Sequence, residues 1–436
     1  MKNTAQIAAV LWLLLAAIGP AQAAPPAATP YHFIRAIVVD PRSPDTLYVA
    51  TDNQGLLKSI DGGKSWSFIN QGIKNYLVYD VKLSITTPGR LYAATWGGGM
   101  YQSNDAGATW RELNEGLGNT AVGEIAIDAD AQRRYDRLAI GTSTELYERR
   151  GDQLAWHAVT DRLRFWNGPQ FQNALVIGPN ANVASFYIGT ERGLYVRQSG
   201  GRGWREVAAL KGKRIAAMTA QPETGWLYAG TVADGGLFIS RNQGITWQPA
   251  GAGLEKSWIR AVLLDPSAPK RLYVATSDAG IVKSDDDGAT WTAINAGLPE
   301  KDVRTLALDP QHSDHLFAGL HGAGLFSSVD GGTTWTKIEG LPFDPVEKQT
   351  AQIDAQTTVA PPGKPAIPAA FAKCNQCHGW TDPALNQKPT YWRATANHRN
   401  WRVTVTRMSE GTTISPEEQA QIAAFLDRYT AEPAAH

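Results

Sequence analysis

The chain has 436 residues, and its 41 Lys and Arg residues balance its 41 Asp and Glu residues, so the formal net charge is zero. This balance gives no support to nucleic acid or an anionic membrane surface as a partner, because both attract an excess of basic residues. The 15 Trp and 42 Gly residues suit short strands joined by tight turns.

Residues 1–23 have the layout of a secretory signal peptide. Lys2 gives a positive start, residues 7–18 carry no charge, and Ala21-Gln22-Ala23 is a small-x-small cleavage site. We expect cleavage near Ala23 and export to the periplasm. An uncleaved membrane anchor is disfavoured because the apolar stretch is shorter than the ~20 residues of a spanning helix. No other segment of the sequence is predicted to span a membrane after signal cleavage.

Residues 31–340 repeat themselves with a period of about 44 residues. A tryptophan that ends a short turn marks each repeat. Four of these turns read Asp-x-Gly-x-Ser/Thr-Trp, a fifth has Asn in place of Asp, and the turns at Trp156 and Trp204 are degenerate. The seven markers are Trp66, Trp110, Trp156, Trp204, Trp247, Trp291 and Trp335.

Four apolar segments recur around each marker and are predicted to be strands. Each is about four to seven residues long, rich in β-branched or aromatic residues, and bounded by Gly, Pro, Asp or Asn. In the first repeat the first three segments are residues 34–40, 47–51 and 55–59, and the fourth segment starts at the marker tryptophan. Four strands per repeat at this period predict one blade of a β-propeller, so seven repeats predict an all-β seven-bladed propeller.

The repeated turns resemble the Asp-boxes of the BNR-repeat families. The whole pattern over residues 31–340 resembles the propellers of sortilin-type proteins and of photosystem II stability and assembly factors. The resemblance implies a structural box, in which Asp caps backbone N–H groups, Gly takes a positive φ and Trp packs between blades. Sialidases also carry Asp-boxes, but the arginine that opens their first repeat in an Arg-Ile-Pro context is absent here. We therefore predict no catalytic residues.

Arginines at equivalent places in three innermost strands are candidates for a binding surface. Arg35, Arg260 and Arg304 each lie five residues before the Asp that ends the segment, in repeats one, six and seven, which are neighbours in a closed ring. Three guanidinium groups at one mouth of the propeller would attract an anion or a partner protein. The alternative is that each pairs with a nearby carboxylate, such as Asp302 or Glu255, and only fills the centre.

Aromatic and basic residues are expected on the same face. Trp96, Trp258 and His321 fall there, and so does the longest insertion, residues 161–173. The insertion contains Arg162, Arg164, Phe165, Trp166 and Phe171. An exposed loop of this composition suits a protein interface, but its aromatic side chains could equally plug the centre of the propeller.

Residues 341–368 are predicted to be a linker, and residues 369–436 a small separate domain. Pro, Gln, Ala and Thr accumulate in the linker, which is typical of an extended tether. The small domain holds the only two cysteines of the chain, in the motif Cys-Asn-Gln-Cys-His. C-x-x-C-H is the attachment site of c-type haem. We therefore predict one covalent haem c on Cys374 and Cys377, with His378 as an axial ligand of the iron.

Met408 is predicted to be the second axial ligand. It is the only methionine of the small domain, and a thioether opposite histidine stabilises reduced iron. His398 is the rival ligand, and an open coordination position is the third alternative. A helix predicted to start at Ser415, with Pro and two Glu in its first turn, ends the domain. This tail resembles the small all-α class I cytochromes c, especially the cytochrome partners of periplasmic molybdenum or quinone-cofactor dehydrogenases.

Three hypotheses about function follow from these predictions. The first is a periplasmic electron-transfer protein, in which the haem carries single electrons and the propeller docks a redox partner protein. The second is a haem oxidoreductase that binds a small anionic substrate at the propeller's mouth. The third is an assembly factor for a redox complex. The first is favoured because electron transfer needs no general acid or base, and whether the chain is an enzyme stays open.

Overall fold

The computed structural model describes residues 34–342, except for residues 53, 130–133, 152, 160–173, 179–184, 199–202 and 233–234. The predicted signal peptide, the insertion at 161–173 and residues 343–436 therefore lie outside the described residues, and with them the predicted haem motif, Met408 and His398. The described part consists of strands and one short 3-10 turn, η1 (Ala208–Leu210). It contains no helix with the length and apolar character that crossing a membrane requires.

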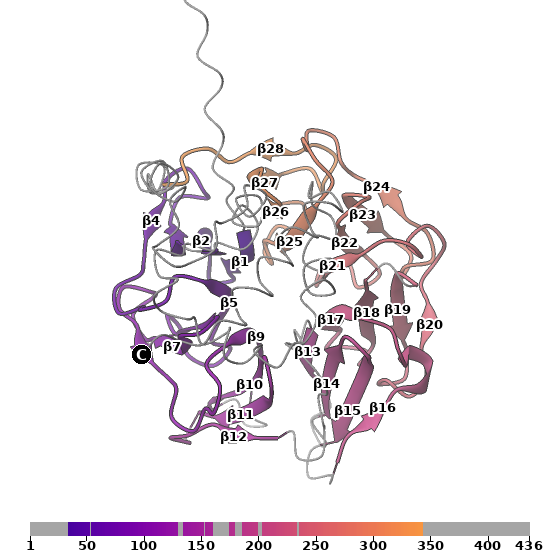
Figure 1. Cartoon of the computed structure of the whole chain (residues 1–436). Helices are drawn as coiled ribbons and strands as arrows, with labels where there is room; N and C mark the ends of the chain where they lie inside the picture. The colour runs from indigo at the N-terminus through magenta and orange to yellow at the C-terminus, as the bar shows by residue number, and fades with distance from the viewer. Residues whose placement is uncertain are drawn as a thin grey trace, which may run out of the picture. The chain divides into compact units, whose positions relative to one another are not determined.

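Seven four-stranded antiparallel sheets follow one another along the chain, and each sheet is one blade (Figure 1). Within every blade the strands pair in sequence order, with the first strand innermost and the fourth outermost. The predicted all-β seven-bladed propeller is confirmed.

The strands of the seven blades are, in chain order, β1 Ile34–Asp40, β2 Ser43–Thr51, β3 Gly55–Ser59, β4 Ser67–Phe68; β5 Val78–Leu83, β6 Leu91–Thr95, β7 Gly99–Ser103, β8 Arg111–Glu112; β9 Val122–Ala129, β10 Asp136–Thr142, β11 Leu146–Arg150, β12 His157–Ala158; β13 Ala174–Ile177, β14 Ser185–Thr190, β15 Gly193–Gln198, β16 Arg205–Glu206; β17 Ile215–Ala220, β18 Leu227–Thr231, β19 Leu237–Ser240, β20 Gln248–Pro249; β21 Ile259–Leu264, β22 Leu272–Thr276, β23 Ile281–Ser284, β24 Thr292–Ala293; and β25 Val303–Leu308, β26 Leu316–Leu320, β27 Gly324–Ser328, β28 Thr336–Lys337.

The fourth strand of each blade differs from its prediction. In every blade it begins at the residue after the marker tryptophan and has only two residues. The tryptophan side chain is needed in the packing between blades, so the chain joins the sheet only after it. A short outermost strand also exposes few unpaired backbone groups, which limits edge-to-edge association.

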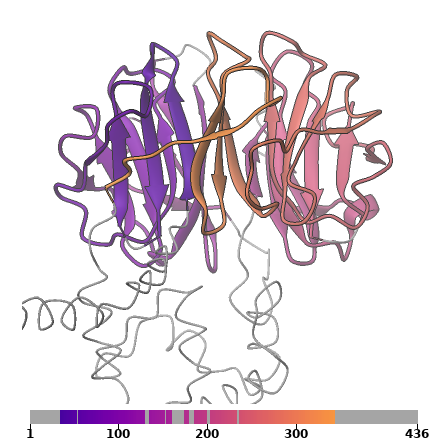
Figure 2. The same cartoon turned by 90° about the horizontal axis from the view of Figure 1, so that it is seen from above.

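The ring closes by contact between the first and last blades. The innermost strands of neighbouring blades contact one another all round, including β1 with β25, and Figure 2 shows the blades side by side. Each blade is made of four consecutive strands, so no strand from one end of the propeller completes the sheet at the other. Closure therefore depends on side chains: Phe317 of blade 7 packs in one cluster with Ile34 and Leu57 of blade 1, together with Ile338 and Leu341.

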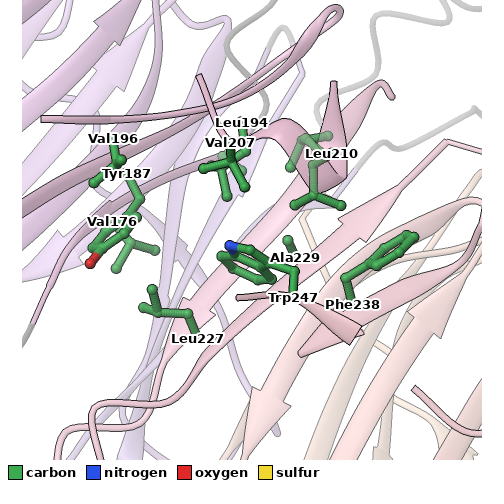
Figure 3. Packing of buried hydrophobic residues seen from close by; sticks show 12 residues of the cluster. Val176, Tyr187, Leu194, Val196, Val207, Leu210, Leu227, Ala229, Phe238 and Trp247 are labelled. Atoms are coloured by element: carbon green, nitrogen blue, oxygen red, sulfur yellow. The ribbon is translucent and has the colours of Figure 1, made fainter. Parts of the chain in front are cut away.

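Most of the core lies between the faces of neighbouring blades. Figure 3 shows one such layer, in which Trp247 and Leu227 of blade 5 pack with Tyr187 and Val176 of blade 4. Equivalent aromatic residues of the second strands are at most 1% exposed in five blades, namely Tyr48, Tyr92, Tyr228, Tyr273 and Phe317. Burial of apolar surface, worth about 25 cal/mol per Å², thus holds neighbouring blades together.

The box turns join the third and fourth strands and hold their shape through local hydrogen bonds. In blade 6, Asp286 accepts hydrogen bonds from the backbone N–H of Thr290 at 2.8 Å and from its hydroxyl at 2.6 Å. Gly288 has a φ of 83°, as the resemblance implied. Ser284 adds a contact outside the predicted motif, since its hydroxyl donates to Asp286 and accepts from the N–H of Gly288. The bonds from Thr290 and Ser284 lower the pKa of Asp286 to about 2.

Four marker tryptophans connect one blade to the next through the indole N–H, namely Trp110, Trp156, Trp204 and Trp335. The indole N–H of Trp335 donates to the carbonyl of Ile294 in the preceding blade at 2.8 Å, and that of Trp110 donates to the carbonyl of Ile69 at 2.7 Å. Trp66 instead donates within its own box, to the carbonyl of Gly63. The box is therefore a structural device, as predicted.

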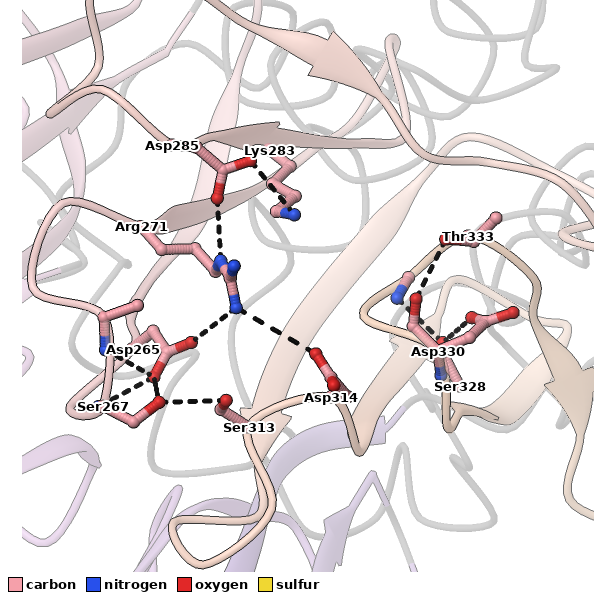
Figure 4. A network of polar contacts seen from close by, with 12 residues as sticks. Asp265, Ser267, Arg271, Lys283, Asp285, Ser313, Asp314, Ser328, Asp330 and Thr333 are labelled. Carbon is pink, nitrogen blue, oxygen red and sulfur yellow. Dashed lines mark hydrogen bonds and ion pairs between the residues drawn. The ribbon is translucent and has the colours of Figure 1, made fainter.

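The Asp that ends several innermost strands organises the end of the propeller opposite the predicted mouth. Asp265 accepts hydrogen bonds from the N–H groups of Ser267 and Ala268, and it lies 3.3 Å from Arg271 (Figure 4). Arg271 also donates to Asp285 at 2.7 Å. These contacts account for the recurring Asp-Pro pattern as turn structure.

Candidate functional site

A β-bulge at the start of the innermost strands places the three predicted arginines. In β1 the register shifts between Ile34 and Ala36, so that Arg35 has no partner in β2. The same shift surrounds Arg260 in β21 and Arg304 in β25. A bulge re-aims the side chain of its extra residue. Three neighbouring blades therefore present an arginine at the same place on what we call the mouth face, where the loops joining second to third strands also lie.

The three arginines, called the arginine cluster below, lie close enough to act on one another. The charges of Arg304 and Arg35 both lower the pKa of Arg260. Two of the guanidinium groups stack on aromatic rings: the guanidinium carbon of Arg260 is 3.3 Å from a ring centroid of Trp258, and that of Arg35 is 4.4 Å from the ring of Tyr79. Such cation–π contacts hold a guanidinium in place without neutralising it.

Carboxylates pair with all three arginines. Arg35 donates two hydrogen bonds to Asp52, at 2.8 and 2.6 Å. Arg260 and Arg304 share one carboxylate, Asp302, at N–O distances of 3.6 and 3.3 Å. The predicted alternative of pairing with Asp302 thus holds for two of the three arginines.

Two of the carboxylate assignments differ from the sequence-based ones. Glu255, the other suggested partner, accepts a hydrogen bond from the N–H of Gly253 instead. Asp52 was not identified from the sequence, although its place directly after β2 puts it in a loop joining the second and third strands. This position in the sequence could have identified Asp52 as a residue of the mouth face.

The pKa values show that carboxylates compensate the buried charge of Arg35 fully and that of Arg260 only in part. Burial lowers the pKa of Arg35, but the charge and hydrogen bonds of Asp52 more than offset this, so the pKa of Arg35 is raised. Burial and the charge of Arg304 lower the pKa of Arg260 to about 9, because the shared Asp302 compensates only in part. The positive charge of Arg260 is therefore less stabilised than that of Arg35.

Several polar atoms beside Arg260 are buried without a hydrogen-bond partner among the described residues. They are Nε of Arg260, the indole Nε1 of Trp258 and Oδ1 of Asp302. Leaving a buried polar group unpaired costs about 1–3 kcal/mol. The structure therefore retains unused hydrogen-bonding capacity around one guanidinium group.

The predicted aromatic and histidine residues of this face adjoin the same cluster. Trp96 stacks on Tyr79, with ring centroids 5.2 Å apart, and Tyr79 in turn lies under Arg35. Nδ1 of His321 is 3.7 Å from Asp302. Burial, followed by the charges of Arg304, Arg260 and Arg35, lowers the pKa of His321 to about 3, so this imidazole is neutral at physiological pH. The insertion at 161–173 lies outside the described residues.

A second charged group, which the sequence did not single out, lies on β5 and β9. Asp80 is 3.2 Å from the ammonium of Lys82 and accepts a hydrogen bond from the N–H of Ile125 in the next blade. Burial and the neighbouring charge of Asp80 raise the pKa of Glu124 to about 8, although Lys82 and the N–H of Leu175 oppose this. Within the described ranges, no three His, Cys, Asp or Glu side chains are grouped as metal ligands. Glu124 is thus a carboxyl whose raised pKa lies close to the physiological pH range.

Sequence comparison finds a relationship over the last part of the propeller. The family described as "Sortilin, neurotensin receptor 3" matches residues 235–341, which run from blade 5 through blade 7. None of the curated proteins matches the chain.

Solved structures share the fold over a larger region. A GH74 xyloglucanase from Xanthomonas campestris has a TM-score of 0.57 at 18% identity, covering 72% of this chain and 55% of that one. YCF48 from Cyanidioschyzon merolae has a TM-score of 0.51 at 16% identity, covering 70% of this chain and 97% of that one. The extracellular domain of a putative one-component system from B. thetaiotaomicron has a TM-score of 0.54 at 16% identity, covering 73% and 40%.

These similarities establish the architecture of the propeller, and they do not establish an activity. This chain spans about half the length of the xyloglucanase that it matches, and identities of 16–18% show a shared fold alone. The described residues form a seven-bladed β-propeller whose last part, residues 235–341, matches the sortilin family model, and YCF48 and a GH74 xyloglucanase share its fold.

Proposed function

We propose that this protein is an exported c-type cytochrome that transfers single electrons, with the propeller as the module that docks its redox partner. The observation that carries the proposal is the C-x-x-C-H motif, which contains Cys374, Cys377 and His378 and follows a predicted export signal. An exported protein with only these two cysteines has the donor set that covalent haem attachment requires. Haem held there would accept and release one electron.

The residues of the small domain have defined roles in this proposal. Cys374 and Cys377 would hold the haem by thioether bonds, His378 would ligate the iron, and Met408 is the proposed second ligand. The proposed linker, residues 341–368, begins where Leu341 packs on the cluster that joins blades 7 and 1.

The mouth face supports the docking part of the proposal. The arginine cluster and its stacked aromatic rings resemble the composition of energetically important interface residues, among which Arg, Trp and Tyr are enriched. Charged groups on such a face also speed the encounter between partners, and salt weakens that effect. The residues that precede the three arginines, Ile34, Ile259 and Val303, are 0% exposed, so the backbone that carries the cluster is anchored in the core.

Expression of the full chain in a host that matures c-type haem tests the cofactor. We expect a coloured protein whose mass exceeds that of the mature polypeptide by one haem, and loss of this extra mass in the Cys374→Ser/Cys377→Ser double variant. In the ferric protein, Met408→Ala should change the axial-ligand spectrum while His398→Ala leaves it unchanged. A colourless protein with the mass of the bare polypeptide would refute the proposal.

Docking is tested by cross-linking the full chain in a periplasmic extract and then measuring electron transfer with the partner so identified. The Arg35→Gln/Arg304→Gln double variant should transfer electrons about tenfold more slowly at low ionic strength, and added salt should reduce the difference. Arg42→Gln is the matched control, because Arg42 is exposed in the loop at the opposite end of the propeller. Equal rates for the wild type and the double variant would exclude the mouth face as the docking surface.

A second candidate function is a haem oxidoreductase that takes a small anionic substrate at the mouth. The observation in its favour is the pair Arg260 and Arg304, whose shared carboxylate, Asp302, lies 3.6 and 3.3 Å away. It would be preferred if the haem were reduced directly by a small anion in the absence of any partner protein. The third hypothesis is an assembly factor for a redox complex. In that case, removal of the haem from this protein would leave electron transfer through the assembled complex unaffected.

A further inference from the structure

Trp258 and Arg260 form an unusual pair at the start of blade 6. They flank Ile259, which is fully buried and fixes the backbone between them. The guanidinium carbon of Arg260 lies 3.3 Å from a ring centroid of Trp258. The two side chains are therefore in direct contact on the mouth face.

Both of these N–H groups are unsatisfied within the described part of the chain. Each nitrogen is buried and has no hydrogen-bond acceptor there. An unpaired buried donor is destabilising, and two such donors side by side are more so. An acceptor from outside the described residues would satisfy both.

The surrounding charges favour a negatively charged acceptor. Arg304, Arg35 and Arg214 all act on Arg260 with like charge, whereas Asp302 is the carboxylate that faces it. Arg35 already has a bidentate partner in Asp52, and Arg214 is paired with Glu191 at 3.6 Å. Glu300 stands near Asp302, and burial and the charge of Asp302 raise its pKa.

We propose that Trp258 and Arg260 form a subsite for a small oxyanion, a carboxylate or a phosphate, whose oxygens accept hydrogen bonds from the indole N–H and the guanidinium Nε–H. Charge-assisted hydrogen bonds of this kind are about twice as strong as neutral ones. The proposal rests on the mouth face being a binding surface, which is part of the proposed function, and it is independent of the haem.

Isothermal titration of the full chain at low ionic strength tests the subsite, with inorganic phosphate in one series and acetate in another. We expect one ion to bind per chain. The anion that binds more tightly shows whether the subsite prefers a phosphate or a carboxylate. Arg260→Gln should weaken binding at least about tenfold, because it removes a hydrogen bond from a charged donor. Trp258→Phe, which keeps a ring under the guanidinium but removes the N–H, should weaken it several-fold.

Two further measurements separate this subsite from general attraction to positive charge. Arg42→Gln should bind the anion as the wild type does, and the melting temperature of each variant checks its folding. The pKa of Arg260 is lowered to about 9, so an anion that raises it again should cause proton uptake on binding at pH 9. This uptake should be absent in Arg260→Gln.

The proposal is overturned if neither anion binds to the wild type, or if Arg260→Gln and Trp258→Phe bind as tightly as Arg42→Gln. Such a result would leave the cytochrome proposal intact, because the partner assay uses Arg35 and Arg304. Conversely, a chain that binds the anion but carries no haem would overturn the proposed function and support the subsite.

Discussion

Glu124 gives the sharpest prediction about stability. It lies on the innermost strand β9, where Oε2 is buried without a hydrogen-bond partner among the described residues. Burial and the charge of Asp80 raise its pKa from 4.5 to about 8, while Lys82 and the N–H of Leu175 act in the opposite direction. The folded chain therefore holds this proton more tightly than the unfolded chain does.

The sign and size of the effect follow from this difference. The contribution of the Glu124 proton to stability is fully present below about pH 4.5 and is lost as the pH rises through about 8. At about 1.4 kcal/mol for each pH unit, the upper limit of the loss is near 5 kcal/mol. Glu124 is partly exposed, and solvent screening reduces this to about 2 kcal/mol.

Replacing the carboxyl by an amide removes the titration and keeps an oxygen that can accept the hydrogen bond of Leu175. We expect Glu124→Gln to melt within a degree or so of the wild type near pH 4.5, and about 2–6 °C above it at pH 9. Glu112→Gln is the control, since Glu112 is an exposed carboxylate paired with Lys74, and its melting difference should stay nearly constant. A Glu124→Gln advantage that is equal at both pH values, or reversed at pH 9, would refute the reasoning.

Three other predictions concern the propeller itself. Asp286→Ala should lower the melting temperature at pH 7, and the difference should disappear as the pH falls from about 3.8 through about 2, because hydrogen bonds from Thr290 lower the pKa of Asp286 to about 2. Ile338→Ala should cost about 2–4 kcal/mol of unfolding free energy in denaturant titrations, because Ile338 belongs to the cluster that closes the ring. Gly72→Ala should lower the melting temperature more than Gly212→Ala: both glycines have positive φ, but only at Gly72 would the added carbon lie 2.1 Å from a backbone oxygen.

The blades were predictable because their signals are local. The box is stabilised by bonds between residues at most four positions apart, such as Asp286 with Thr290 and Ser284 with Gly288. Five of the seven turns therefore carry their own sequence signature. The length of the fourth strand was not predictable in this way, because it depends on where the tryptophan side chain is placed between two blades.

The partners of the mouth residues were harder to predict because they are distant along the chain. Arg35 pairs with Asp52 in the same blade, but Arg260 reaches Asp302 in the next one. Asp80 and Glu124 were missed although a signal existed. They occupy the position that alanine holds in β1, β17 and β21, and a charged residue in place of that alanine marks a departure from simple packing.

The bulge explains how a repeated fold can carry a site that is not repeated. The residue before the bulge is apolar and 0% exposed in six blades, namely Ile34, Val78, Val122, Ile215, Ile259 and Val303. The bulged residue that follows differs from blade to blade, being Arg35, Tyr79, Gly123, Ala216, Arg260 and Arg304. Packing thus constrains the first position and leaves the second one free, because a bulged residue has no partner in the neighbouring strand. Substitutions at the bulge can therefore change what the mouth face binds while the contacts that close the ring stay the same.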